Sequence, residues 1–321
     1  MNTASPAPAR TPIARDAVDL AVAIGGVTLK NPVLTASGTF GYGLEYDDFY
    51  DVAELGGICS KGLSLEPRHG NAPERIAETA AGMLNAIGLA NVGVEAFCKE
   101  KLPTLRKRGV AVVANVFATT VADFEKLTRR LDGEEGITAI ELNVSCPNVD
   151  KGGLEFGCDP AAAARVTEAC RAATKLPLWV KMSPEAGEPK KVGLACQEAG
   201  ADALTAINTI RGLAIDVHSW KPRIANATGG LSGPALKPIA IRLVWELSRA
   251  VTIPIIGIGG IARTEDAVEF MLAGASAVQV GTANFADPMA AKKILEGLRD
   301  YCAQRGLAAR DLIGKLDFVK R

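Results

Sequence analysis

The motif NVSCPN, at residues 143–148, holds the side chains with the clearest capacity for chemistry. Cys146 stands between Asn143 and Asn148, and Pro147 restricts the loop. A thiol beside amide groups can act as a nucleophile or as a base, whereas most cysteines are inert and partly buried. We assign the inert role to the other six, which lie in predicted strands or helices or lack converging polar neighbours: Cys59, Cys98, Cys158, Cys170, Cys196 and Cys302.

Two lysines and three further asparagines also stand at or beside apolar runs. Lys61 ends the run GGICSK, and Lys181 ends LWVK. A cation in such a place suits an anionic ligand, although a structural salt bridge would account for it equally well. Asn85, Asn115 and Asn208 add amide groups, each with a donor and an acceptor that can recognise the carbonyl and N–H groups of a ring.

Three glycine-rich segments point to a phosphorylated ligand. They are GGLSGP (229–234), which leads into a predicted helix, GIGGI (257–261) and GT (281–282). Backbone N–H groups in such loops bind phosphate without a basic side chain, although tight turns also use glycine. Because the last two segments come at the ends of successive predicted strands, we expect a phosphate site there, with FMN the leading redox candidate.

These residues fall mostly at the ends of eight apolar, strand-like runs that alternate with helical segments. The predicted strands are 33–36, 57–60, 111–116, 138–142, 178–181, 203–207, 254–257 and 277–280. The predicted helices include 121–131, 160–174, 189–199, 234–250, 264–273 and 288–305. Such alternation is typical of parallel strands joined by crossover helices, and eight units predict an α/β fold, a single (β/α)8 TIM barrel.

The segment before the first barrel strand has its own pattern. Residues 20–30, LAVAIGGVTLK, predict an N-terminal β-hairpin that closes the bottom of the barrel. A doubly wound open sheet is the rival architecture, but no GxGxxG motif follows the first strand. We predict a disordered N-terminal tail, residues 1–18, for which a short targeting peptide is the weaker alternative, and one FMN-binding catalytic barrel, residues 19–321.

Composition narrows the range of partners. Of 321 residues 48% are hydrophobic, and 36 Lys and Arg balance 36 Asp and Glu, so nothing predicts binding to nucleic acid or to a membrane. The seven cysteines have no paired CxxC spacing, and there are only two histidines. We therefore expect reduced thiols, no metal site and a cytoplasmic location.

Together the motifs resemble those of the class 1 dihydroorotate dehydrogenases, from about Leu20 to the C-terminus. The matching segments are NPVLTASGTFGYG (31–43), SKGLSLEPRHGN (60–71), GMLNAIGLAN (82–91), NVSCPN (143–148), INTIRGLAID (207–216), GGLSGPALKP (229–238), IIGIGGI (255–261) and VQVGTANF (278–285). NAIGLAN and TGGLSGPALKPIAIRLVWEL are similar to the B-type branch. In that branch the catalytic subunit pairs with a separate subunit that carries FAD and an iron–sulfur cluster and reacts with NAD.

The resemblance implies oxidation of dihydroorotate to orotate in pyrimidine (UMP) biosynthesis, with one FMN per chain. Cys146 would remove a proton from the carbon beside the carbonyl, while hydride passes from the adjacent carbon to FMN. The implied substrate-binding residues are Lys61, Asn85, Ala86, Ile87, Gly88, Leu89, Asn143, Asn148, Asn208 and Thr209. The implied FMN-binding residues are Ser37, Lys61, Gly62, Asn115, Asn143, Lys181, Ile207, Gly233, Gly259, Gly260, Gly281 and Thr282.

Several alternatives stay open at this point. The same family resemblance includes a fumarate-using branch, and the flavin barrels of dihydropyrimidine dehydrogenases are similar. A barrel that binds a phosphorylated ligand without catalysis is a further possibility, which the placement of Cys146 disfavours. No cysteines have iron–sulfur spacing, so a 2Fe-2S cluster and FAD are expected only on a partner subunit, in a heterotetramer or beside a homodimer.

Overall fold

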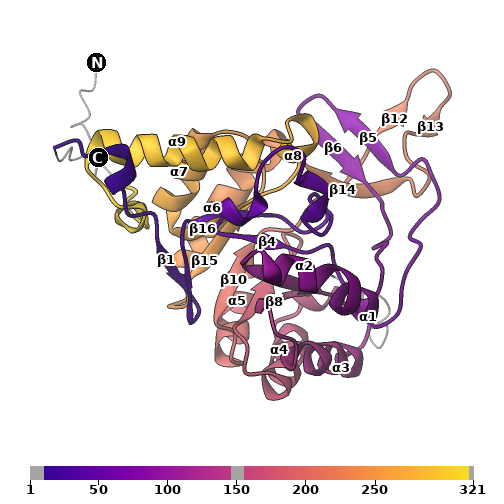
Figure 1. Cartoon of the computed structure of the whole chain (residues 1–321). Helices are drawn as coiled ribbons and strands as arrows, with labels where there is room; N and C mark the ends of the chain where they lie inside the picture. The colour runs from indigo at the N-terminus through magenta and orange to yellow at the C-terminus, as the bar shows by residue number, and fades with distance from the viewer. Residues whose placement is uncertain (1–10, 146–154, 318–321) are drawn as a thin grey trace.

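The computed structural model describes residues 11–145 and 155–317, and its centre is a closed barrel of eight parallel strands (Figure 1). The strands are β3 (Val33–Thr35), β4 (Gly57–Cys59), β7 (Val112–Val116), β8 (Ile137–Asn143), β9 (Leu178–Lys181), β10 (Ala203–Ala206), β15 (Ile255–Ile258) and β16 (Ala275–Val280). They follow one another around the barrel in chain order, and β16 pairs with β3 to close it. The eight predicted strands and the predicted (β/α)8 fold are confirmed.

Helices cover the outside of the barrel, as Figure 1 shows. Their bounds are α1 (Val94–Ala96), α2 (Leu102–Lys107), α3 (Val121–Asp132), α4 (Pro160–Ala173), α5 (Pro189–Glu198), α6 (Lys237–Ser248), α7 (Thr264–Ala273), α8 (Ala283–Ala286) and α9 (Ala290–Arg305). The side chains of Thr120 and Asp159 accept backbone N–H groups at the starts of α3 and α4. Such caps satisfy donors that a helix leaves free, which is why these helices begin where predicted.

The core lies between the strands and the helices. Every residue of β7 is buried, so its side chains fill the barrel interior on one face and meet helices on the other. On α3, Phe124, Leu127 and Leu131 are fully buried at helical spacing against this layer. The sequence pattern and the packing therefore agree: apolar runs form the wall, and amphipathic helices shield it.

The predicted hairpin is present at the amino ends of the strands. β1 (Val22–Ile24) and β2 (Val27–Leu29) pair in antiparallel fashion, and Ile24 and Leu29 are buried. Gly25 turns with φ +50°, and a Cβ added there would lie 2.7 Å from the carbonyl oxygen of Asp202, just before β10. The hairpin therefore closes the bottom of the barrel, as predicted.

We expect Gly25→Ala to lower the free energy of unfolding by about 3 kcal/mol, because left-handed strain is added to a steric conflict with Asp202. Gly26→Ala is the matched control: its φ is +86°, yet no atom lies within 4 Å of the added Cβ. The control is expected to cost about 1–2 kcal/mol. Urea unfolding measures both losses, and equal losses would contradict the close contact at Asp202.

The described part of the N-terminal region lies along α9. Residues Arg15–Ala17 form a short 3-10 helix, and the Arg15 guanidinium pairs with Glu296 and Asp300. The backbone N–H of Ile13 also donates to the carbonyl of Ala303 at 3.0 Å. Residues 1–10 lie outside the described ranges, and for them the predicted disorder stays a prediction.

A second sheet, which the sequence analysis did not predict, packs at the barrel mouth. It is antiparallel, in the order β11 (Ile210–Leu213), β14 (Thr228–Ser232), β6 (Gly82–Asn85), β5 (Ile76–Thr79), and a hairpin of β12 (Ile215–Asp216) and β13 (Lys221–Pro222) extends from it. The phosphate loop predicted at 229–234 is thus corrected. Gly229 and Gly230 pair in a sheet, and only Gly233, with φ +98°, turns toward the helix that follows.

Candidate active site

A cavity of about 540 Å³ opens at the carboxyl ends of the barrel strands. It is lined by ten of the residues predicted to bind cofactor or substrate: Ser37, Lys181, Ile207, Asn208, Thr209, Gly233, Gly259, Gly260, Gly281 and Thr282. They come from the ends of five different strands and from the second sheet. Parallel strands bring their carboxyl ends to one mouth, so residues far apart in the sequence converge there.

The glycines of the cavity lie where side chains would not fit. Gly259 and Gly260 have φ +131° and +77°. A Cβ on Gly260 would lie 2.8 Å from the backbone nitrogen of Lys237 and 2.9 Å from the carbonyl oxygen of Gly233. The loop after β15 therefore packs directly on the start of α6. This is the end of the seventh barrel strand, where barrels commonly hold a phosphate on backbone N–H groups.

The loop after β16 completes that side of the cavity. The Thr282 hydroxyl donates to the Ser232 hydroxyl at 2.8 Å, which ties the end of the eighth barrel strand to β14. Gly281 lines the cavity beside it. The loops that follow β15 and β16 therefore both place backbone atoms around the same cavity, and this arrangement fits the phosphate of FMN.

Buried polar groups stand inside the barrel; of these Lys181 lines the cavity, whereas Asn115 and Gly62 are not among its lining residues. Lys181 is only 5% exposed, although it carries a charge. The Oδ1 atom of Asn115 is buried without a hydrogen-bond partner among the described residues, and a Cβ on Gly62 would lie 3.0 Å from it. An unpartnered acceptor is costly unless a ligand donor reaches it. A flavin offers a ring N–H for the amide and negative charge, when reduced, for the lysine, so these residues fit FMN.

Amide groups join the ends of β8 and β10. Asn208 Nδ2 donates to Asn143 Oδ1 at 3.1 Å, and Asn208 Oδ1 accepts the backbone N–H of Thr209 at 2.8 Å. Asn143 Oδ1 also accepts the backbone N–H of Ser145 at 3.3 Å. This pairing orients both amides at the mouth, where each keeps capacity to bind a polar heterocycle.

Lys61 follows β4 and is half-buried. Its backbone N–H donates to the carbonyl of Gly41 at 2.9 Å, which fixes the start of the loop. Burial lowers the pKa of the Lys61 ammonium; nearby Arg75 lowers it further, and Glu45 opposes the shift. A partly desolvated cation of this kind binds a carboxylate more strongly than an exposed one would.

The segment around Asn85 is held by the second sheet and by Asn71. Asn85 Nδ2 donates to the carbonyl of Gly230 at 3.2 Å, and Asn71 Nδ2 donates to the carbonyl of Ala86 at 2.9 Å. The neighbouring residues, Ile87, Gly88 and Leu89, do not line the described cavity. Substrate contact by Asn85–Leu89 stays a prediction.

The predicted base and one predicted amide cannot be placed. Cys146 and Asn148 fall between the described ranges, which end at residue 145 and resume at 155. The other six cysteines are free thiols, and five of them are buried. The sequence analysis did not foresee their polar partners: Cys59 contacts Glu141, and Cys158 contacts Glu155 and Ser183.

Other cavity residues were also missed. Thr79, Ala81 and Met83, from β5, β6 and their turn, line the mouth, as does the half-exposed Phe285 after β16. A signal was present in RIAETAAGMLN, where two short runs flank small residues in the manner of a hairpin. Glu141 had a signal too, since it is the one charged residue of β8, a mostly apolar strand.

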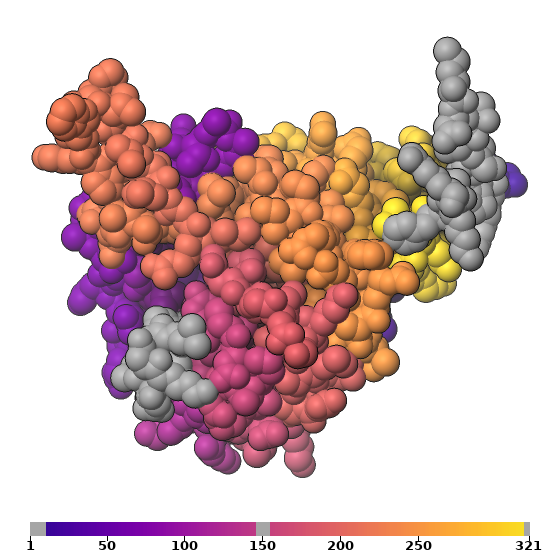
Figure 2. All heavy atoms as spheres, turned by 180° about the vertical axis from the view of Figure 1, so that it is seen from behind, coloured from indigo at the N-terminus to yellow at the C-terminus, as the bar shows by residue number. Residues whose placement is uncertain are grey.

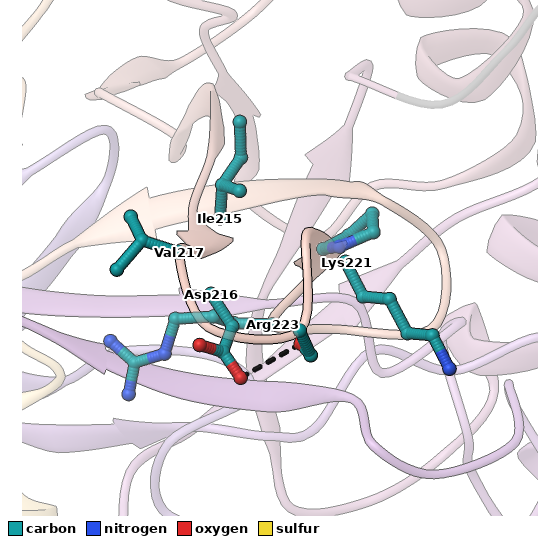
Figure 3. Close-up of a pocket in the computed structure, with 7 residues that line it drawn as sticks. Ile215, Asp216, Val217, Lys221 and Arg223 are labelled. Atoms are coloured by element: carbon teal, nitrogen blue, oxygen red, sulfur yellow. Dashed lines mark hydrogen bonds between the residues drawn. The ribbon is translucent and has the colours of Figure 1, made fainter.

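A second hollow, of about 630 Å³, lies on the β12–β13 hairpin (Figure 3). Its charged side chains, Asp216, Lys221 and Arg223, all come from this one hairpin, which stands away from the barrel in Figures 1 and 2. Asp216 accepts the Ser219 hydroxyl at 2.8 Å within the turn. No strand end of the barrel reaches this hollow. It therefore does not bring together residues from distant parts of the sequence, as the barrel mouth does.

Two searches of residues 11–145 and 155–317 gave no candidate. None of the helices there combines the length and apolar character needed to cross a bilayer. Within the same ranges, acidic, histidine and cysteine side chains nowhere gather in groups of three or more that could hold a metal ion.

The fold and the site define a class: an α/β-barrel enzyme whose mouth suits a phosphorylated ring cofactor and a small polar substrate. The model of the dihydroorotate dehydrogenase family matches residues 19–301, and the chain belongs to this family. It is 53% identical over 299 residues to a protein of Geotalea daltonii, covering 93% of this chain and 98% of that one. That relative is named dihydroorotate dehydrogenase B (NAD(+)), catalytic subunit.

Two further relatives carry the same name. The protein of Pelobacter propionicus is 53% identical over 300 residues, which cover 93% of this chain and 99% of the relative. The protein of Geobacter sulfurreducens is also 53% identical over 300 residues, with 93% and 98% covered. These similarities cover most of this chain and nearly all of each relative.

Proposed function

We propose that this chain oxidises dihydroorotate to orotate, in pyrimidine biosynthesis, with FMN bound at the barrel mouth. The observation that carries the proposal is the convergence on one cavity of a set of glycines, the buried Lys181 and Asn208, whose amide is bonded to that of Asn143. Membership of the dihydroorotate dehydrogenase family supports the same conclusion.

Different residues would bind the phosphate and the ring of FMN. Gly233, Gly259, Gly260, Gly281 and Thr282 would surround the phosphate, and Lys181, Asn115 and Gly62 would meet the ring. FMN bound in this way supplies a two-electron acceptor for hydride. The Lys181 ammonium stabilises negative charge at the ring, and its burial strengthens the effect because little water screens it.

The chain itself must remove one proton from the substrate. We assign this step to Cys146, which the motif places directly after Ser145, at the end of β8. A free thiol has a pKa of about 8.5, so a fraction ionises near neutral pH and can accept a proton from carbon. A hydrogen bond from its backbone N–H to Asn143 Oδ1 holds Ser145, the residue before Cys146 in the sequence.

The substrate has a ring with amide groups and a carboxylate. We assign binding of the ring to Asn143, Asn208 and Thr209, and Asn85 and Asn148 would join them. Lys61 is the cation proposed to bind the carboxylate. Orientation by several fixed groups aligns the carbon to be oxidised with the acceptor, which is a main source of rate enhancement.

The electrons must then leave the chain. The relatives are named as catalytic subunits of an NAD(+) enzyme, which implies another subunit. We propose a partner subunit with FAD and a 2Fe-2S cluster that passes electrons to NAD, in a cytoplasmic heterotetramer built on a dimer of this chain. The relatives' name favours this NAD-linked branch over the fumarate-using one.

Lys61 gives a test of the substrate. The KM for dihydroorotate is expected to be lowest while Lys61 is charged, and to rise as the pH rises through its pKa. Because burial and Arg75 lower that pKa, the rise should begin at a lower pH than an exposed lysine would give. Lys61→Met should raise KM about 10- to 100-fold at neutral pH and remove this dependence.

Dihydrouracil, which lacks the carboxylate, is the matched substrate. The wild-type chain is expected to oxidise it poorly, and Lys61→Met should change its KM little. Efficient oxidation of dihydrouracil by the wild type would instead favour a dihydropyrimidine dehydrogenase activity and contradict the assigned substrate.

A further inference from the structure

Glu141 is a buried carboxylate at the centre of the barrel, below the cavity. It lies on β8 and is fully buried. Its Oε1 atom accepts hydrogen bonds from Asn115 Nδ2 at 2.7 Å and from the Cys59 thiol at 3.3 Å. Its Oε2 atom accepts from Thr205 Oγ1 at 2.8 Å and from Gln279 Nε2 at 2.8 Å. Four other strands therefore donate to one side chain.

Such a residue is unusual for the place it occupies. The interior of a barrel of this kind is normally filled with branched apolar side chains, and a buried charge is costly unless it is bonded and balanced. The four hydrogen bonds satisfy the carboxylate oxygens. They do not supply a positive charge to balance the negative charge of the carboxylate.

A positively charged residue, Lys181, stands on the adjacent strand, β9. Strand pairing places Lys181 beside Asn143, two residues after Glu141, where side chains again point to the same face. The thiol of Cys59 is exposed to both charges: Glu141 raises its pKa and Lys181 lowers it, in addition to the larger upward effect of burial. Glu141 and Lys181 therefore both influence the Cys59 thiol inside the barrel.

Asn115, on β7, joins the carboxylate to the residues proposed to meet the flavin ring. Its Nδ2 atom donates to Glu141, which leaves Oδ1 as the acceptor without a partner. If the Asn115 amide were turned over, its Oδ1 atom would face the Glu141 carboxylate, and two hydrogen-bond acceptors would meet. The carboxylate therefore determines which end of the amide is offered to a ligand.

We propose that Glu141 is a positioning residue of the flavin site: it fixes the Asn115 acceptor and offsets part of the Lys181 charge. The inference rests on the proposed FMN site. Its consequence is electrostatic, because a fixed negative charge near the ring disfavours the reduced, more negative flavin. Glu141 therefore lowers the midpoint potential of bound FMN.

Glu141→Gln tests the charge with little change in shape. Gln279 Oε1 has no partner among the described residues, so its amide can turn over and accept a hydrogen bond from the new Nε2. We expect the affinity for reduced relative to oxidised FMN to rise about tenfold, which raises the midpoint potential by about 30 mV for this two-electron couple. The potential is measured by anaerobic dye equilibration.

Two further variants separate charge from structure. Thr205→Val removes one hydrogen bond to the same carboxylate and keeps the charge, so Tm should fall while the potential stays at the wild-type value. Glu141→Asp keeps the charge but shortens the side chain away from Asn115. It is expected to weaken FMN binding about tenfold, as measured by the fluorescence of released flavin.

The outcomes are distinct. A wild-type potential in Glu141→Gln overturns the electrostatic role, and wild-type FMN affinity in Glu141→Asp overturns the positioning role. If Glu141→Gln does not fold, Glu141→Asp still tests the positioning role. Wild-type FMN affinity in Glu141→Asp then overturns the proposal. A wild-type protein that does not bind FMN would contradict the proposed function itself, whatever the variants do.

Discussion

Cys146→Ala is expected to slow the reduction of bound FMN by dihydroorotate about 10²- to 10⁴-fold at neutral pH, while FMN stays bound. The variant removes the group that accepts the substrate proton but leaves the glycine cradle and Lys181 in place. Anaerobic stopped-flow absorbance measures the rate directly, without any electron acceptor. Fast reduction in this variant would refute the role of Cys146 as the base.

Cys158→Ala is the control for that experiment. Cys158 is the one partly exposed thiol among the described residues, and its Sγ contacts Glu155 and Ser183. Burial and the Glu155 carboxylate raise its pKa, which makes it a thiol that seldom ionises near neutral pH. Wild-type reduction rates are expected for Cys158→Ala, so that a large loss in Cys146→Ala alone identifies the base.

Gly260→Ala is expected to raise the FMN dissociation constant by about 100-fold, which corresponds to about 2.7 kcal/mol. The added Cβ would lie 2.8 Å from the Lys237 nitrogen and 2.9 Å from the Gly233 oxygen, so the loop after β15 must move away from α6. That movement displaces the backbone N–H groups proposed to bind the phosphate. Flavin fluorescence on dilution measures the release.

Gly109→Ala supplies the matched control. Its φ of +69° is close to the +77° of Gly260, so both variants carry similar backbone strain. No atom lies within 4 Å of the Cβ added at Gly109, which stands in the turn after α2. This variant should bind FMN as the wild type does. Equal FMN affinity in both variants would contradict the proposed phosphate cradle.

The barrel could be predicted because its signals are local. Each barrel strand is a short apolar run, such as 112–116, and the helices between them begin at recognisable caps such as Thr120 and Asp159. Since parallel strands share one mouth, the residues at the strand ends could be assigned to one site without knowledge of their contacts. Nine of them, together with Gly233 after β14, do line a single cavity.

The second sheet and Glu141 depend on contacts that are distant in the sequence. β14 has the sequence TGGLS, without the alternation of a typical strand, and it forms because β6 and β11 pair with it on either side. Glu141 is tolerated in the barrel because donors from β4, β7, β10 and β16 surround it. The local sequence signals the β5–β6 hairpin and the acidic residue of β8, but it does not show which distant strands supply their partners.

The most direct test of the account is an anaerobic visible spectrum of the FMN-loaded chain, recorded before and after addition of dihydroorotate, with NADH added to a separate sample. Dihydroorotate is expected to bleach the flavin absorption and NADH alone is not, because the sample holds no electron-transfer partner. Flavin absorption that dihydroorotate leaves unchanged would contradict the assigned reaction.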